Sequence, residues 1–98
     1  MAFLQIIEFE SGRIDEFNAN LDKWMAESEG KRIPHHVMLC KDRDAEDRYL
    51  FTVQFSSYDK AMENSSRPET AAFAAFLSDL CDGPLAFRNL DVMRVEDM

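Results

Sequence analysis

The sequence predicts an α+β fold with the element order β-α-β-β-α-β. Four runs of bulky and β-branched apolar residues, at residues 2–10, 35–40, 49–55 and about 85–95, indicate strands. The segments after the first and third runs place apolar residues three and four positions apart, as amphipathic helices do. A chain of 98 residues encloses one hydrophobic core, so residues 1–98 are expected to form a single domain.

The first strand is expected to end at Ser11-Gly12, where the apolar run stops. The segment that follows carries its apolar residues on one helical face, with charged and amide residues between them. These apolar positions are Ile14, Phe17, Leu21, Trp24 and Met25. Ser11 is a residue type that caps helix N-termini, and Gly30 is a type that follows helix C-termini. We therefore expect a helix between Ser11 and Gly30.

Turn signals divide the second half of the chain. The strongly charged residues 41–48 separate two extended runs and are expected to form a solvated hairpin loop. After Ser56-Ser57 a helix is predicted to begin, to stall at residues 64–66 and to start again. Residues 66–69 (SRPE) have the pattern of a capping box with proline in the first turn. The restarted helix is expected to end at Gly83-Pro84, before the last strand.

The composition argues against several kinds of partner and site. The formal charge is −8, and the longest basic run is Lys31-Arg32, so neither nucleic acid nor an anionic membrane is an expected partner. Cys40 and Cys81 lack the spacing of a metal site or a redox motif, and they are expected to be free thiols. No metal or cofactor is predicted. The sequence has no secretory signal pattern and no apolar run of the ~20 residues that span a bilayer, which predicts a cytoplasmic protein.

Both faces of the predicted sheet are apolar, because side chains alternate between the two faces of a strand. In the first strand Ala2, Leu4 and Ile6 share one face, and Phe3, Ile7 and Phe9 share the other. Later strands show the same pattern. Two helices cover one face of a four-stranded sheet. The other face is therefore expected to meet a second copy of the chain in a symmetric homodimer.

This arrangement resembles the dimeric α+β barrel superfamily, and in particular the antibiotic biosynthesis monooxygenase-like group. The resemblance covers nearly the whole chain and rests on Ile7-Glu8-Phe9, residues 11–17 (SGRIDEF), Arg48-Tyr49 and residues 55–61 (FSSYDKA). It implies a ferredoxin-like fold with a four-stranded antiparallel sheet. Members of the superfamily include cofactor-free oxygenases of polycyclic hydroquinones and anthrones, haem-degrading enzymes and stress-related dimers. The fold alone therefore leaves the function open.

The resemblance singles out three positions for a ligand site. Gln5 is the one polar residue between Leu4 and Ile6, at the strand position where haem-degrading relatives carry a functional asparagine. It either contacts a ligand or forms structural hydrogen bonds within the core. Aligned on Pro68, the chain has Phe73 where haem degraders have their iron-binding histidine, and Asn64 where they have a tryptophan. Because phenylalanine cannot ligate iron, haem degradation is not expected.

The other candidates come from residue type and spacing. His35 and His36 are adjacent, so in a strand they point to opposite faces and cannot jointly bind one metal ion. His36 is a candidate base, or it lines a cavity or the dimer interface. The Tyr58 hydroxyl is a candidate donor to a substrate oxygen. Phe17, Trp24, Phe73 and Phe76 lie on the inward stripes of the helices and either line a flat aromatic pocket or belong to the core.

Two functions are consistent with these features. In the first, the protein is a cofactor-independent monooxygenase that acts on a small planar aromatic substrate. Gln5, His36, Tyr58 and Asn64 are then the catalytic candidates, and the four aromatic residues form the substrate-binding walls. In the second, it is a non-catalytic homodimer that binds a small ligand or acts as a stress-related module. The sequence has no nucleophile elbow and no glycine-rich phosphate loop, which argues against hydrolases and nucleotide-binding proteins.

Overall fold

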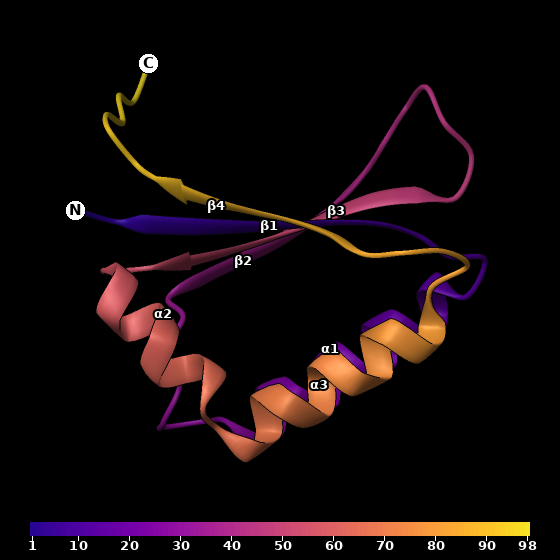
Figure 1. Cartoon of the computed structure of the whole chain (residues 1–98), viewed down its shortest axis with the longest axis horizontal. Coiled ribbons are helices and arrows are strands. Elements are labelled where there is room, and N and C mark those ends of the chain that lie inside the picture. The colour runs from indigo at the N-terminus through magenta and orange to yellow at the C-terminus, as the bar shows by residue number, and fades with distance from the viewer.

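The computed structural model describes residues 1–98 and shows one four-stranded sheet with three helices on one of its faces (Figure 1). The elements in chain order are β1 (Phe3–Glu10), α1 (Ile14–Glu27), β2 (His36–Lys41), β3 (Arg48–Phe55), α2 (Tyr58–Ser65), α3 (Pro68–Leu80) and β4 (Ala86–Asp91). All strand pairs are antiparallel, and the spatial order is β2-β3-β1-β4. The predicted α+β, ferredoxin-like fold is confirmed, and the predicted stall and restart of the second helical segment is the break between α2 and α3.

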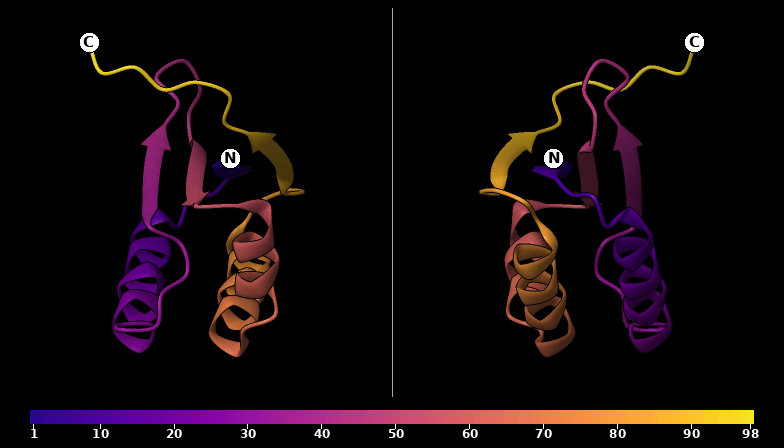
Figure 2. Two further views of the ribbon diagram at one scale, coloured as in Figure 1. Left: turned by 90° about the vertical axis from the view of Figure 1, so that its left-hand side faces the viewer. Right: turned by 90° about the vertical axis from the view of Figure 1, so that its right-hand side faces the viewer.

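The two central strands direct their large apolar residues toward the helices. In β1 these are Phe3, Ile7 and Phe9, and in β3 they are Tyr49, Phe51, Val53 and Phe55, all of them buried. Gln5 shares this face, because it lies two residues from both Phe3 and Ile7. α1 and α3 run side by side beneath the sheet (Figure 2) and cover this face.

Phe17 of α1 is the centre of the core, with no solvent exposure. Its ring lies 5.3 Å from that of Phe9 on β1 and 5.2 Å from that of Phe51 on β3. On the helix side, its ring centroid is 5.7 Å from that of Phe73 on α3. One side chain therefore joins two helices to the two central strands. Edge-on and stacked ring contacts of this kind stabilise the fold beyond the contribution from burying the rings.

Ser11 does not cap α1 as the sequence suggested, but links the start of α1 to the end of α3. Arg13, not Ser11, is the N-cap of α1, and it makes no side-chain cap hydrogen bond. The buried Ser11 hydroxyl accepts a hydrogen bond from the Arg13 N–H at 3.0 Å and donates one to the Leu80 carbonyl at 3.1 Å. It therefore ties the start of α1 to the end of α3. Gly30 has a φ of +79°, a conformation that glycine adopts without strain, and it follows the end of α1 as predicted.

The break between α2 and α3 is built differently from the predicted capping box. The Ser66 hydroxyl donates a hydrogen bond to the Glu63 carbonyl at 2.7 Å, so Ser66 closes α2 instead of capping α3. Arg67 is the N-cap of α3 and makes no side-chain cap bond. Pro68 is the first residue of α3, where its missing N–H costs nothing. The break gives the chain a corner between the two helices.

The second face of the sheet is covered by no helix (Figures 1 and 2). Its apolar members are Leu4, Ile6, Met38, Cys40, Leu50, Ala86 and Leu90, as the register between the strands requires. The last strand is shorter than predicted, since β4 ends at Asp91 instead of about Val95. Met93 and Val95 lie beyond the sheet, 81% and 73% exposed, so neither contributes to either face.

Replacing Phe17 with alanine should destabilise the fold by about 3–5 kcal/mol. The substitution would leave a cavity at the point where α1 contacts β1, β3 and α3. Phe87→Ala is the matched control: Phe87 is 52% exposed, and its truncation should cost about 1 kcal/mol or less. Urea-induced unfolding followed by circular dichroism measures both free energies. Equal losses in the two variants would contradict the central role of Phe17.

Candidate ligand-binding pocket

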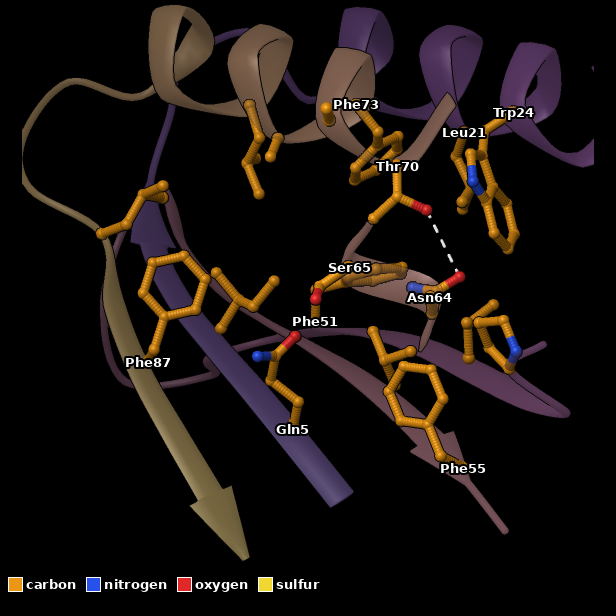
Figure 3. Close-up of a pocket in the computed structure, with 18 residues that line it drawn as sticks. Gln5, Leu21, Trp24, Phe51, Phe55, Asn64, Ser65, Thr70, Phe73 and Phe87 are labelled. Carbon is orange, nitrogen blue, oxygen red and sulfur yellow. Dashed lines mark hydrogen bonds between the residues drawn. The ribbon is translucent and has the colours of Figure 1, made fainter. Parts of the chain in front are cut away.

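A pocket of about 250 Å³ lies between the helix-facing side of the sheet and the helices, and it is partly open to solvent (Figure 3). Thirteen of its 18 lining residues are hydrophobic. The strands contribute Ile7, Phe51, Val53, Phe55 and Phe87, among others. The helices contribute Leu21 and Trp24 from α1 and Phe73, Ala74 and Leu77 from α3. The mostly apolar lining with a few polar groups is that of a small-molecule site, and the volume lies just below the range of about 300–1,000 Å³ that is usual for drug-sized ligands.

Aromatic rings form two walls of the pocket. The Trp24 and Phe73 ring centroids lie 6.4 Å apart with an angle of 62° between the planes, so the edge of one ring meets the face of the other. Phe73 also lies 5.9 Å from Phe51 of β3. Phe87 of β4 is half exposed at the rim of the pocket. A flat apolar molecule would find ring faces and edges on several sides.

Four neutral polar side chains line the pocket: Gln5, Asn64, Ser65 and Thr70. The Thr70 hydroxyl donates a hydrogen bond to Asn64 Oδ1 at 3.3 Å, across the break between α2 and α3 (Figure 3). The Ser65 hydroxyl donates to the Met62 carbonyl at 2.8 Å. Gln5 Nε2 donates to Asn89 Oδ1 at 3.3 Å on the neighbouring strand β4. The remaining amide atoms, Gln5 Oε1 and Asn64 Nδ2, have no partner within the chain.

No ionisable side chain lines the pocket. The residues present can therefore donate and accept hydrogen bonds, but none is a general base or acid near neutral pH. Nor do three or more His, Cys, Asp or Glu side chains cluster anywhere in positions that could hold a metal ion. The pocket suits a ligand that binds in its uncharged form, because a permanent charge would lose water there without gaining an opposite charge. A negative charge that forms during a reaction could be stabilised only by hydrogen bonds from the neutral polar groups.

The groups with shifted pKa values lie outside the pocket. A hydrogen bond between Arg13 and Glu16 raises the pKa of the arginine and lowers that of the glutamate. A hydrogen bond to Glu10 raises the pKa of Arg48. Burial raises the pKa of the Cys81 thiol, which keeps it protonated. None of these groups is close enough to line the site.

The structure brings four of the eight candidate residues together. Gln5, Asn64, Trp24 and Phe73 all line the pocket. Phe17 and Phe76 do not line it: Phe17 is fully buried in the core, and Phe76 packs against that core. Tyr58 is 53% exposed at the start of α2, with its ring edge against Phe3 at 5.4 Å. His36 lies exposed on the other face of the sheet, so neither His36 nor Tyr58 reaches the pocket.

Sequence reasoning missed Ser65, Thr70 and Phe87 as pocket residues. A signal for Thr70 was present, because it precedes Phe73 by three residues and therefore shares its helical face. Ser65 was assigned only to the helix break. Phe87 was placed in the last strand, but the sequence could not tell which face of that strand the helices cover.

A four-stranded antiparallel sheet with helices on one face defines a ferredoxin-like α+β protein, and in this one an apolar pocket lies between the two layers. No protein-family model matches the sequence, and no curated protein matches it significantly. Solved structures, in contrast, match the fold along almost the whole chain. The fold is that of the antibiotic biosynthesis monooxygenase proteins.

Three of these structures illustrate the likeness. An asparagine-to-alanine mutant of SnoaB, a cofactor-independent oxygenase from Streptomyces nogalater, has a TM-score of 0.79 at 15% identity, covering 96% of this chain and 95% of SnoaB. A Caulobacter crescentus protein provisionally named an antibiotic biosynthesis monooxygenase has a TM-score of 0.79 at 14% identity, covering 95% and 91% of the two chains. Rv0793 from Mycobacterium tuberculosis has a TM-score of 0.76 at 17% identity, covering 99% and 100%. At these identities the likeness shows the fold.

Binding of an uncharged aromatic probe should not depend on pH, because binding is linked to pH only through groups that change their protonation. The affinity for 2-methoxynaphthalene, measured by calorimetry from about pH 5.5 to 9, should stay constant. Ala71→His places a titratable ring in the lining and should weaken binding below about pH 6.5, where the ring is charged. A sigmoidal profile in the unmodified protein would show that an ionisable group reaches the pocket.

Proposed function

We propose that the protein is a cofactor-independent oxygenase that oxidises a small planar aromatic substrate with molecular oxygen. The observation that carries this proposal is the pocket itself: about 250 Å³, lined by aromatic rings, with hydrogen-bonding amides and no charge. An engineered cavity of about 150 Å³ holds one benzene ring, so the pocket has room for about two fused rings. The name of SnoaB, a cofactor-independent oxygenase of the same fold, supports the reaction type.

The chemistry suits a pocket without a base. An activated aromatic methylene next to a carbonyl loses a proton to water at the open side of the pocket and forms an oxygen-stabilised anion. The anion passes electrons to O₂ and forms a carbon–oxygen bond, giving a peroxide anion that takes up a proton and becomes a hydroperoxide. Loss of water from the hydroperoxide leaves a carbonyl group, so that R₂CH₂ and O₂ become R₂CO and H₂O. The Asn64 amide would donate a hydrogen bond to the developing oxyanion.

A second function is favoured by one specific observation. The pocket supplies no group that can remove a proton, and its neutral polar residues would serve equally well to bind a ligand by hydrogen bonds. A non-catalytic module that binds a small aromatic ligand is therefore the alternative. It predicts a rise in melting temperature on ligand binding without consumption of oxygen.

Oxygen uptake with 2-indanone or 2-tetralone, two-ring ketones with a benzylic methylene next to the carbonyl, distinguishes the two functions. For an oxygenase, ¹⁸O₂ should place one labelled oxygen in the product, and Asn64→Ala or Gln5→Ala should each lower turnover by at least about tenfold. Asn18→Ala removes an amide from the exposed face of α1 and should leave turnover unchanged. If both ketones raise the melting temperature and neither consumes oxygen, the binding module is correct. If Asn64→Ala and Gln5→Ala both keep full turnover, the assigned site is wrong.

We also propose that the protein works as a homodimer joined through the uncovered face of the sheet. This face holds half-exposed apolar residues on both edge strands, such as Met38 on β2 and Leu90 on β4. Its charges balance: Glu8 and Glu10 are matched by Arg48 and Arg88, although the whole chain carries −8. Arg48 pairs with Glu10 at 2.7 Å and with Glu8 at 3.6 Å. Two copies of an acidic protein can meet through a face that is itself neutral and apolar.

The variant Ile6→Glu should convert the dimer to a monomer. It adds one carboxylate per copy at the centre of the interface, where burial of charge is costly even beside Arg88 on the neighbouring strand, and it makes the neutral face net negative on both copies. Ala75→Glu adds the same charge to the exposed surface of α3 and should leave the dimer intact. Sedimentation at micromolar concentration reports the assembly. Alkylation of Cys40, which lies on the same face, should be slow in the dimer and fast in the Ile6→Glu monomer. A monomeric unmodified protein would overturn this proposal.

A further inference from the structure

We propose that Asn89 and Thr70 are positioning residues that fix the hydrogen-bonding polarity of the pocket. Each holds one end of an amide side chain, so that Gln5 presents an acceptor and Asn64 presents a donor to the ligand. The pocket then selects an uncharged aromatic ligand that carries both a hydroxyl donor and a carbonyl acceptor. This inference rests on the proposed function, because it specifies the ligand of the same pocket.

Asn89 orients Gln5 across the β1–β4 pair. The two residues are directly opposite each other in the register, on the face that bears the pocket. Gln5 Nε2 donates to Asn89 Oδ1 at 3.3 Å, which turns the nitrogen toward β4. Figure 3 shows the result: the Gln5 oxygen points into the pocket and its nitrogen points to the side of β4. An amide oxygen has two lone pairs and accepts from a ligand hydroxyl.

Thr70 orients Asn64 in the opposite sense. Its hydroxyl donates to Asn64 Oδ1 at 3.3 Å, so the amide oxygen is turned toward α3. In Figure 3 the Asn64 nitrogen is the atom that faces the middle of the pocket. An amide nitrogen only donates, and its natural partner is a carbonyl or an oxyanion. The break between α2 and α3 makes this bond possible, because the two residues belong to different helices.

Ser65 supplies a second hydrogen-bond acceptor near that of Gln5. Its hydroxyl proton is engaged by the Met62 carbonyl at 2.8 Å, so its oxygen can only accept a further hydrogen bond. Figure 3 shows that oxygen on the side of Ser65 that faces Gln5. Two acceptors therefore face one region of the pocket, and a ligand hydroxyl placed there would satisfy either of them. A methyl ether at the same position would have no proton to offer.

Matched probes test both halves of the proposal. 6-Acetyl-2-naphthol has two rings, one hydroxyl donor and one carbonyl acceptor. Its methyl ether lacks the donor, and 6-isopropyl-2-naphthol lacks the acceptor. Calorimetry on the unmodified protein should give an affinity for the first compound about five- to tenfold above that for either of the others, the effect of one hydrogen bond.

Variants assign each preference to its positioning residue. Asn89→Ala removes the acceptor that holds Gln5 and should abolish the preference for the hydroxyl over the methyl ether, while the preference for acetyl over isopropyl remains. Asn89→Asp keeps an acceptor oxygen and should restore the hydroxyl preference. Thr70→Val should abolish only the acetyl preference, and Thr70→Ser should restore it. A purely structural role would change the affinities for all three probes together, so the two ratios separate positioning from stability.

The outcomes separate this inference from the function on which it rests. If all three probes bind the unmodified protein with equal affinity, the inference is overturned and the aromatic pocket stands. If the two preferences exist and survive Asn89→Ala and Thr70→Val, the amides hold their orientation without these partners, and the inference is also overturned. If no probe binds, the proposed function and the inference fall together. Selective loss of each preference, with rescue by the conservative variant, supports the inference.

Discussion

The packing of Phe17 between the two layers is the contact on which the rest of the structure depends. Its ring meets one ring from each central strand and one from α3, so the distance between helices and sheet is set at this point. Phe51 and Phe73 belong both to this cluster and to the pocket lining. The pocket is therefore the continuation of the core toward Trp24 and the break between α2 and α3, where no side chain fills the space between the layers.

The break between α2 and α3 places polar side chains in the lining of the pocket. A continuous helix would place Asn64 and Thr70 six residues apart, with their side chains on different faces. Because Ser66 closes α2 and Pro68 opens α3, the chain turns between them and the two side chains form a hydrogen bond. The same corner brings Ser65 to the pocket. All the polar groups that α2 and α3 supply to the pocket thus come from one local irregularity.

The fold could be predicted from the sequence because its signals are local: strand alternation, helical spacing and a proline at the helix restart. Gln5 was singled out by the resemblance, and in the structure strand alternation puts it on the same face as Phe3 and Ile7. The sequence could not show which face of the sheet the helices cover, since both faces are apolar, and this is why His36 was proposed for a site that lies on the other side. Tyr58 was proposed from its residue type alone. The Gln5–Asn89 and Asn64–Thr70 bonds depend on strand register and on the helix corner, which no spacing in the sequence reveals.

The separation between the aromatic core and the polar lining has an evolutionary consequence. The residues that give the pocket its polarity, Gln5, Asn64, Thr70 and Asn89, are all outside the fully buried core. Each can be exchanged by a single substitution without opening a cavity around Phe17, and such changes generally cost little stability. A lineage with this scaffold can therefore acquire a new ligand preference in small steps, each of which leaves a folded protein on which selection can act.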